Sequence, residues 1–265
     1  MKTMLKICIL TTDTPHHRYF VNEIFASLPS GVELASIVFE TRKLNWKKLA
    51  ARYAVSRFPN LIDGLLYNPY IPSTRLEANI LKFERENFFK DNTDEMPQDL
   101  EVVYFDSVNG QDCHDYLIAK QCDVFFVFGT GLIAERIFSL PRIAAINAHG
   151  GRLPDYRGLD TNLWAIFEGR ALDMAVSMHL VEKSFDTGAL VEQEPIPLDP
   201  GLSIVNLRFV TTKLIVKMTK RIIRNLVNGR LEYKEQQFVG RYYGPMPHIY
   251  KLKSSKTLSR LTEFQ

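Results

Sequence analysis

The sequence predicts an α/β protein built on one mixed, mostly parallel sheet, with helices on both faces and a short C-terminal appendage. Apolar runs of strand length alternate with segments of helical periodicity along most of the 265 residues. With 46% hydrophobic residues, the chain can bury a sizeable core. Between residues 180 and 189 the connection is too short for a crossover helix, so the two strands that it joins are expected to be antiparallel neighbours.

The strand and helix alternation begins at the N-terminus, where a buried strand ends at Thr11 and Pro15 suits the first turn of a helix. Strands are expected at 5–10, 32–39, 101–105, 123–128, 142–148, 175–180 and 189–196. Helices are expected at 16–28, 111–120, 132–138, 161–168 and 203–228. This order is typical of a Rossmann-like sheet, but the turn after the first strand has no glycine. The sequence therefore gives no support for a dinucleotide-binding site or for a P-loop nucleotide site.

Residues 41–97 interrupt this alternation with polar and aromatic segments of helical pattern, at 46–58 and 74–90, which prolines separate. We interpret them as a helical insertion, which would serve as a lid, as a flap over a substrate or as a packing surface for a second subunit. The predicted organisation is one main domain at 1–229 that contains the insertion, followed by an extension at 230–265 of short strands or loop.

Cysteine usage and hydropathy point to the cytoplasm. Cys8, Cys113 and Cys122 follow no CxxC spacing, which favours a reducing compartment over a disulfide framework or a zinc site. No apolar window approaches the roughly 20 residues that span a bilayer, and the first apolar run is too short for a signal peptide. We therefore predict a cytoplasmic protein with no integral membrane segment.

The basic residues concentrate near the C-terminus. From Gly201 onward the sequence has 13 Lys or Arg against 3 Asp or Glu, although the formal net charge of the whole chain is only +3. Such an excess suits a phosphate-bearing ligand, an anionic membrane surface or nucleic acid. A solvated helix face is the alternative interpretation.

An amide and an imidazole stand together where the strand at 142–148 ends. Asn147 and His149 are two residues apart, so their side chains point to the same side, at the sheet edge where ligands of parallel sheets bind. Asp186 lies in the short loop after the next strand. A carboxylate raises the pKa of an adjacent imidazole and an amide adds a donor, so the three groups can stabilise an oxyanion and manage a proton.

Other interpretations of this group are weaker or open. Asn147 and His149 alone would serve equally well as strand caps that bond to nearby backbone. A metal site needs about three protein ligands, and the sequence offers no third ligand at a plausible spacing. No Ser or Cys stands against a base, which favours direct attack by an amine on a bound acyl donor over a covalent acyl-enzyme.

The residues around this group resemble a known family. The string N-x-H-x-G-x-L-P-x-Y-R-G at 147–158, then W-A-I-x-x-G, a strand that ends in His, and D-T-G at 186–188 is similar to the formyltransferases that use 10-formyltetrahydrofolate. The match runs from about residue 124 to 191. It implies a formyltransferase whose catalytic triad is Asn147, His149 and Asp186. The implied contacts to the donor cosubstrate, with no metal, are Phe128, Gly129, Thr130, Gly131, Leu132 and Asp186.

Gly151 and Arg152 depart from the family pattern, because many members have Ser and Leu at these two places. The triad is untouched by this difference. The contacts that the loop makes to donor or acceptor are expected to differ.

Within the family, the chain looks most like the nucleotide-sugar N-formyltransferases. Methionyl-tRNA formyltransferases carry a further domain after the catalytic part, whereas only residues 230–265 follow Gly229 here. Glycinamide ribonucleotide formyltransferases have a glycine-rich loop after the first strand, which this chain lacks, and the formyltetrahydrofolate hydrolases carry a regulatory module ahead of the first strand. The expected partner is therefore a nucleotide-linked amino sugar rather than nucleic acid.

By the same resemblance the amino sugar is a 4-amino-4,6-dideoxy sugar on GDP or dTDP, as in lipopolysaccharide O-antigen biosynthesis, and the protein is a homodimer. Acceptors of the methionyl-tRNA or glycinamide ribonucleotide type stay open. So does a non-catalytic module that binds folate or a sugar nucleotide.

A diphosphate-bearing acceptor requires cationic or donor groups near the carboxyl edge of the sheet. The candidates after the first strand and around the triad are Thr12, His16, His17, Arg18, Gly150, Gly151 and Arg157. Surface residues without a ligand are the alternative for 16–18, and pairing with a carboxylate or with carbonyls is the alternative for Arg157. In the expected mechanism, Asn147 and a protonated His149 stabilise the tetrahedral oxyanion, and Asp186 keeps His149 charged.

Overall fold

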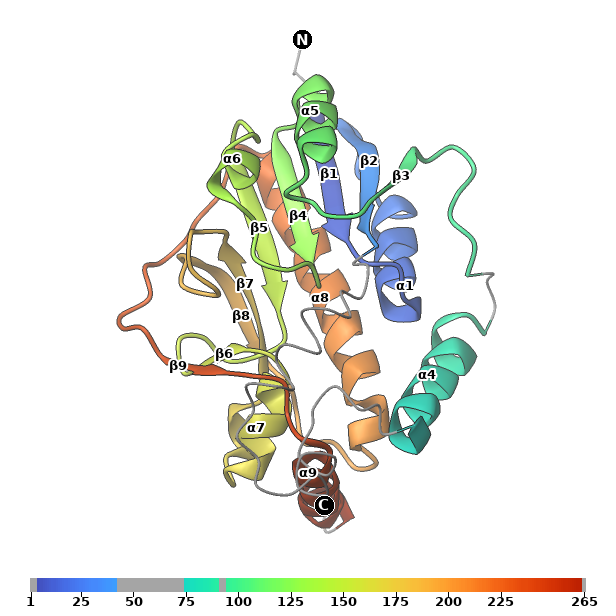
Figure 1. Cartoon of the computed structure of the whole chain (residues 1–265), viewed down its shortest axis with the longest axis vertical. Coiled ribbons are helices and arrows are strands. Elements are labelled where there is room, and N and C mark those ends of the chain that lie inside the picture. Colours follow the sequence, from blue (N-terminus) through green and yellow to red (C-terminus); the bar gives the residue numbers. More distant parts are fainter. Residues whose placement is uncertain (1–3, 42–73, 91–93, 264–265) are drawn as a thin grey trace, which may run out of the picture.

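A seven-stranded mixed sheet forms the centre of the computed structural model, which describes residues 4–41, 74–90 and 94–263 (Figure 1). The first five strands in the order β3-β2-β1-β4-β5-β7-β8 are parallel, whereas β7 pairs antiparallel with both β5 and β8. The strands are β1 (Leu5–Thr11), β2 (Val32–Glu40), β3 (Val102–Phe105), β4 (Val124–Phe128), β5 (Ala144–His149), β7 (Ala175–Leu180) and β8 (Leu190–Pro195). The predicted Rossmann-like sheet with an antiparallel side is thus confirmed.

Helices cover both faces of this sheet, as predicted. Ile7 and Ile9 of β1 pack in the cluster that contains α1 and α8, whereas Cys8 and Leu10 pack in the cluster that contains α5 and α6. This alternation follows from the period of two along a strand that is buried on both faces. The helices are α1 (Pro15–Phe25), α4 (Thr74–Phe88), α5 (Gln111–Lys120), α6 (Glu135–Phe138), α7 (Thr161–Phe167), α8 (Ile204–Val227) and α9 (His248–Glu263).

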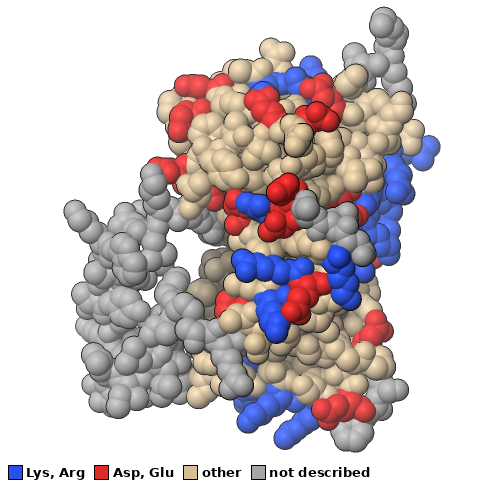
Figure 2. All heavy atoms as spheres, turned by 90° about the vertical axis from the view of Figure 1, so that its right-hand side faces the viewer, with Lys and Arg blue, Asp and Glu red and all other residues tan. Residues whose placement is uncertain are grey.

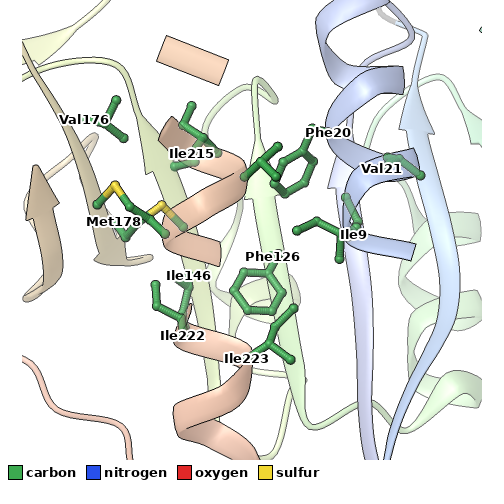
Figure 3. Packing of buried hydrophobic residues seen from close by; sticks show 14 of the residues in the cluster. Ile9, Phe20, Val21, Phe126, Ile146, Val176, Met178, Ile215, Ile222 and Ile223 are labelled. Atoms are coloured by element: carbon green, nitrogen blue, oxygen red, sulfur yellow. The ribbon is translucent and has the colours of Figure 1, made fainter. Parts of the chain in front are cut away.

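Helix α8 is the main cover of one face. Ser203 accepts a hydrogen bond from the backbone N–H of Asn206, and the Asn206 side chain accepts from the Ser203 N–H, which satisfies two donors at the helix start. Ile215 and Ile222 of α8 point toward Ile146 of β5 and Met178 of β7 (Figure 3). Because α8 spans β4, β5 and β7, it fixes the strand ends that carry the predicted site.

The extension at 230–265 differs from the prediction of short strands or loop. Residues 248–263 form α9, which packs on α7, and a short strand β9 (Arg241–Tyr243) pairs in parallel with β6 (Tyr156–Gly158). The buried positions of α9 are Ser254, Leu258 and Thr262, which have helical spacing but only one apolar side chain. The apolar periodicity that predicts a helix is therefore absent, and packing against α7 stabilises α9 instead.

The remaining boundaries shift by a few residues. Helix α1 ends at Phe25 rather than at 28, and α6 begins at Glu135 rather than at 132. In the insertion, α4 lies within the predicted helix at 74–90, whereas the predicted helix at 46–58 lies outside the described residues. The division of the chain at 229 stays a prediction.

Much of the basic excess of α8 is paired with carboxylates. The pairs are Arg208 with Glu77 and Glu84, Lys217 with Glu194, Lys220 with Glu23, and Arg221 with Glu192 and Glu194. Figure 2 likewise shows acidic and basic side chains side by side near the middle of the face that it displays. Within the described ranges, no helix has the length and apolar character to cross a membrane.

Candidate active site

A cavity of about 570 Å³ lies at the carboxyl ends of β4 and β5, where the sheet topology predicts a ligand site. This volume is within the usual range for small-molecule sites. The walls come from the start of α1, from α4 and α8, from residues 158–163, from the 181–186 loop, and from two side chains of the C-terminal segment, Tyr242 and Lys251.

The cavity brings together the three residues of the predicted triad. Asn147 and His149 project from the end of β5, and Asp186 follows β7 in a loop that returns over them. The antiparallel register of β5 and β7 places His179 opposite Asn147, so a second imidazole joins the group. We call Asn147, His149, His179 and Asp186 the catalytic group below, after the role that the sequence predicts for three of them.

His179 orients the amide of Asn147. The Nδ1–H of His179 donates to the carbonyl oxygen of Leu180 at 2.8 Å, so in the neutral ring Nε2 is an acceptor. Asn147 Nδ2 donates to this Nε2 at 3.0 Å. An amide nitrogen has two N–H bonds, and this arrangement leaves the second one for a substrate oxygen.

His149 is held from its other side. Its Nε2 donates to the carbonyl oxygen of Tyr156 at 2.8 Å, which leaves Nδ1 facing the Asp186 Oδ1 at 3.6 Å. Burial lowers the pKa of His149, and the nearby Asp186 carboxylate offsets only part of this effect. The electrostatics therefore favour a neutral His149 at pH 7 in the resting site, in contrast to the protonated form expected from the sequence.

Asp186 stays ionised. Burial raises its pKa, but the nearby His149 and His179 imidazoles and the Gly158 N–H together outweigh burial and bring the pKa to about 2. The Gly158 N–H donates to Asp186 Oδ2 at 2.8 Å, and His179 Nε2 lies 3.4 Å from Asp186 Oδ1. A fixed negative charge thus stands beside two imidazoles, ready to stabilise either one when it gains a proton.

The predicted donor loop lines the same cavity, with Phe128, Gly129, Thr130, Gly131 and Leu132 all at its surface. Thr11 Oγ1 donates to the Phe128 carbonyl oxygen at 2.7 Å and so ties the loop to β1. Gly129 has a φ of +81°, and a Cβ there would lie 2.3 Å from His17 Nε2. Only glycine allows both this backbone conformation and the close approach of the His17 ring.

Only some of the predicted acceptor contacts lie at the cavity. His16, His17 and Gly150 line the cavity, whereas Thr12, Arg18, Gly151 and Arg157 do not. Thr12 hydrogen-bonds His17 Nδ1 at 2.9 Å, and Arg18 forms a two-point ion pair with Asp13. Arg157 donates to the carbonyl oxygens of Phe185 and Gly240, which matches the alternative considered for it from the sequence.

Sequence reasoning missed a charged wall of the cavity where α1, α4 and α8 meet. Arg208 donates to both carboxylate oxygens of the fully buried Glu84, at 2.5 and 3.0 Å, and to Glu77 at 3.2 Å. His16 Nδ1 lies 3.7 Å from Glu84, and burial lowers the His16 pKa. We call His16, Glu77, Glu84 and Arg208 the charged wall. Because these residues lie far apart in the sequence, no local sequence pattern indicates that they form a cluster.

The comparison with protein families decides the identity of this arrangement. A family model described as formyl transferase matches residues 82–220, which is more than half of the chain. The chain belongs to the formyl transferase family. The match includes β4, β5, the donor loop, the catalytic group and most of α8.

Relatives of known function resemble parts or all of this formyl transferase. Methionyl-tRNA formyltransferase of Thermotoga maritima is 28% identical over 142 residues, which cover 53% of this chain and 45% of the relative. The chain thus matches about half the length of such curated relatives. Among solved structures, an N-formyltransferase from Helicobacter canadensis in complex with folinic acid and dTDP-3-aminofucose has a TM-score of 0.56 at 14% identity, covering 99% of this chain and 83% of its own.

Glycinamide ribonucleotide transformylase 1 from Symbiobacterium toebii has a TM-score of 0.57 at 14% identity, covering 88% of this chain and 95% of its own. At such identities the similarity shows a shared fold. Within the described residues, no group of three or more His, Cys, Asp or Glu side chains is arranged to hold a metal ion.

Proposed function

We propose that this formyl transferase moves a formyl group from 10-formyltetrahydrofolate to the amine of a nucleotide-linked amino sugar. The observation that carries the proposal is the catalytic group itself. An ionised Asp186, two imidazoles and an amide with a spare N–H face one cavity beside a backbone-rich loop. These groups suit attack on a carbonyl carbon, in which an oxyanion and a proton must be handled together.

The reaction begins with a neutral amine that attacks the formyl carbon of the donor. A C–N bond forms, and the carbonyl electron pair moves to the oxygen, where the free N–H of Asn147 stabilises the negative charge. His149 Nδ1 takes the proton of the attacking nitrogen, and Asp186 stabilises the resulting imidazolium. When the intermediate collapses, the bond from carbon to N10 of the folate breaks and His149 returns the proton to N10.

Two features support the donor assignment. Gly129 and Gly131 offer backbone groups without side chains along one wall, which suits a flat pterin ring. Val181, Ser184 and Phe185 line the cavity next to them, so the loop that carries Asp186 contacts the same ligand. A related structure of the same fold was solved with folinic acid, a formylated folate.

Two features support a nucleotide-linked amino sugar as the acceptor. The Helicobacter canadensis relative, which holds dTDP-3-aminofucose, shares the fold over nearly the whole chain, including the C-terminal segment that contributes Tyr242 and Lys251 to the cavity. The charged wall adds a guanidinium, an imidazole and a partly exposed Glu77 carboxylate. Such groups bind phosphate oxygens and sugar hydroxyls by hydrogen bonds.

The decisive experiment incubates the protein with 10-formyltetrahydrofolate and a panel of amines, and measures release of tetrahydrofolate. The panel contains GDP- and dTDP-linked 4-amino-4,6-dideoxy sugars, their 3-amino isomers, glycinamide ribonucleotide and methionyl-tRNA. We expect release with one of the sugar nucleotides. Release with only the ribonucleotide or the tRNA would replace the acceptor class, and no release despite donor binding would favour a non-catalytic binding module.

The same preparation tests the proposed homodimer. Light scattering is expected to give twice the mass of the 30.5 kDa chain. A monomer at the concentration of the assay would remove the dimer from the proposal.

A further inference from the structure

The segment that follows α8 reaches back to the loop that carries Asp186. Gln236 Nε2 donates to the carbonyl oxygen of Asp186 at 3.0 Å and to that of Gly188 at 2.7 Å, so one side-chain amide spans this turn. We propose that Gln236 is a positioning residue, which holds the turn so that the Asp186 carboxylate faces His149. The inference rests on the proposed function, because it assigns Gln236 a role in the same reaction.

The position of Asp186 depends on its backbone. Its φ is +56°, in the left-handed region that residues other than glycine rarely adopt. Its carboxylate lies 3.6 Å from His149 Nδ1, which is longer than a hydrogen bond. Attraction to His149 alone therefore does not fix the position of the Asp186 side chain. The Gly158 N–H, which donates to Asp186 Oδ2 at 2.8 Å, and the backbone of the turn together set its position.

Arg157 holds the other side of the same turn. Its Nε and Nη2 donate to the Phe185 carbonyl oxygen at 3.0 and 2.8 Å, and its Nη1 donates to the Gly240 carbonyl oxygen at 2.9 Å. Arg157 and Gln236 thus take the carbonyl oxygens of residues 185, 186 and 188. Both side chains connect the turn to residues 236–240 of the C-terminal segment, which lie far away in sequence.

The C-terminal segment is itself anchored where Gln236 needs it. Lys234 and Leu190 exchange two backbone hydrogen bonds of 2.8 Å, which join the segment to β8 just before Gln236. After Gln236, β9 pairs with β6, whose Tyr156 carbonyl orients His149 and whose Gly158 N–H binds Asp186. The residues that orient the catalytic group therefore share one small sheet with the C-terminal segment.

The chemistry of the Gln236 amide fits a donor role. Both contacts use Nε2, whereas Oε1 is buried and accepts no hydrogen bond from the described residues. The turn thus requires two N–H bonds at this place, which glutamine supplies and glutamate does not. A carboxylate in the same position would face two carbonyl oxygens and would repel them.

Three variants test the inference in the full-length protein, namely Gln236→Ala, Gln236→Glu and the control Gln237→Ala, whose side chain is exposed. Misplacement of a catalytic group by about 1 Å costs up to about 100-fold in rate, so we expect kcat to fall about 10- to 100-fold in both Gln236 variants. The KM values for donor and acceptor are expected to change less than about threefold, because Gln236 does not line the cavity. The control is expected to match the wild type.

The pH dependence of kcat supplies a readout that a merely structural role does not move. Asp186 raises the pKa of His149 against the effect of burial. A displaced Asp186 therefore lets this pKa fall further, and the acid limb of the kcat profile is expected to move to lower pH in the Gln236 variants. An unchanged limb with reduced kcat would contradict the positioning role.

Asp186→Ala separates the failure of this inference from the failure of the proposed function. Loss of turnover in Asp186→Ala together with wild-type kcat in Gln236→Ala would overturn only the role of Gln236. Wild-type turnover in Asp186→Ala would instead contradict the role that the proposed function gives to the catalytic group.

Hydrogen exchange provides a test that needs no acceptor. Peptides covering 181–190 are expected to exchange faster in Gln236→Ala than in Gln237→Ala, with the rest of the chain unchanged. Equal exchange in the two variants would overturn the inference, and so would a rise over the whole chain.

Discussion

The catalytic group and the charged wall are two clusters of similar composition, and both contribute side chains to one cavity. Each contains a buried imidazole whose pKa burial lowers, and each contains a buried carboxylate. In the charged wall, Glu84 accepts two hydrogen bonds from Arg208, at 2.5 and 3.0 Å. In the catalytic group, Asp186 Oδ1 lies 3.4 and 3.6 Å from its imidazoles.

This difference shows how to distinguish a structural cluster from a reactive one. A carboxylate that is fully buried against a guanidinium is out of reach of a substrate, and it fixes α4 against α8. A carboxylate whose imidazole neighbours stand just beyond hydrogen-bond distance retains the capacity to act on a substrate. A buried His beside a buried acid is therefore not by itself a sign of catalysis.

The largest effect expected from this contrast is on turnover. His149→Ala removes the group that moves the proton, and Asn147→Ala removes the donor to the oxyanion. Each is expected to lower kcat about 100- to 1000-fold. His16→Ala, in the charged wall, is expected to change kcat less than about tenfold. Steady-state kinetics with the acceptor found in the panel measure both. Equal losses in His149→Ala and His16→Ala would erase the distinction between the two clusters.

The second effect is on stability and concerns Glu84. Glu84→Ala removes the fully buried partner of Arg208 and leaves the guanidinium with Glu77 alone, so we expect the free energy of unfolding to fall by about 3 kcal/mol. The control is Glu86→Ala on the same helix, because Glu86 is exposed and its ion pair among the described residues is with Lys82 at 3.8 Å. Urea unfolding measures both variants. A loss below about 1 kcal/mol in Glu84→Ala would show that the wall does not hold α4.

The third effect is a pH dependence of stability from Asp186. Its pKa falls from 3.8 in the unfolded chain to about 2 in the fold, so the folded state favours the ionised form. The resulting stabilisation, about 2 kcal/mol, is complete above about pH 5 and is lost as the pH falls through 2. Asp186→Asn is expected to lack this component, so the stability difference between it and the wild type shrinks on acidification. A difference that stays constant from pH 7 to pH 3 would contradict the assigned pKa.

The smallest expected effect concerns Gly151, where many family members have Ser. A Cβ at this position would lie 2.5 Å from Thr161 Oγ1 and 2.6 Å from His149 Nε2, so a neighbour must move. Gly151→Ala is expected to lower kcat about tenfold by shifting the His149 ring, which corresponds to about 1.4 kcal/mol. The additional change Thr161→Ala is expected to restore part of the loss. Wild-type kcat in Gly151→Ala would show that the ring has more room than the structure indicates.

Much of the fold and the core of the site were predictable from local pattern. The ends of α5 and β7 agree with the predicted residues 111–120 and 175–180, because both carry clear periodicity. Asn147 and His149 were recognisable because an amide and an imidazole interrupt an apolar strand. His179 was harder to assign, since its place beside Asn147 appears only when the antiparallel register of β5 and β7 is known.

The rest of the site depends on contacts between segments that are far apart in the chain. Glu84 and Arg208 are separated by 124 residues, and Gln236 and Asp186 by 50. Helix α9 was missed because its buried face consists mainly of Ser254 and Thr262 rather than apolar residues.

Periods of two and of 3.6 residues along the chain were sufficient to determine the chain order of the strands in the main sheet, its two-sided burial and the strand end at which the candidate site lies. Packing in three dimensions decided the rest. It set the directions of the pKa shifts of His149 and Asp186, the pairing of Glu84 with Arg208, and the contacts between Gln236 and the turn that carries Asp186. The physical reason is that burial and charge act through space over a few ångströms, so they depend on neighbours that the local sequence does not contain.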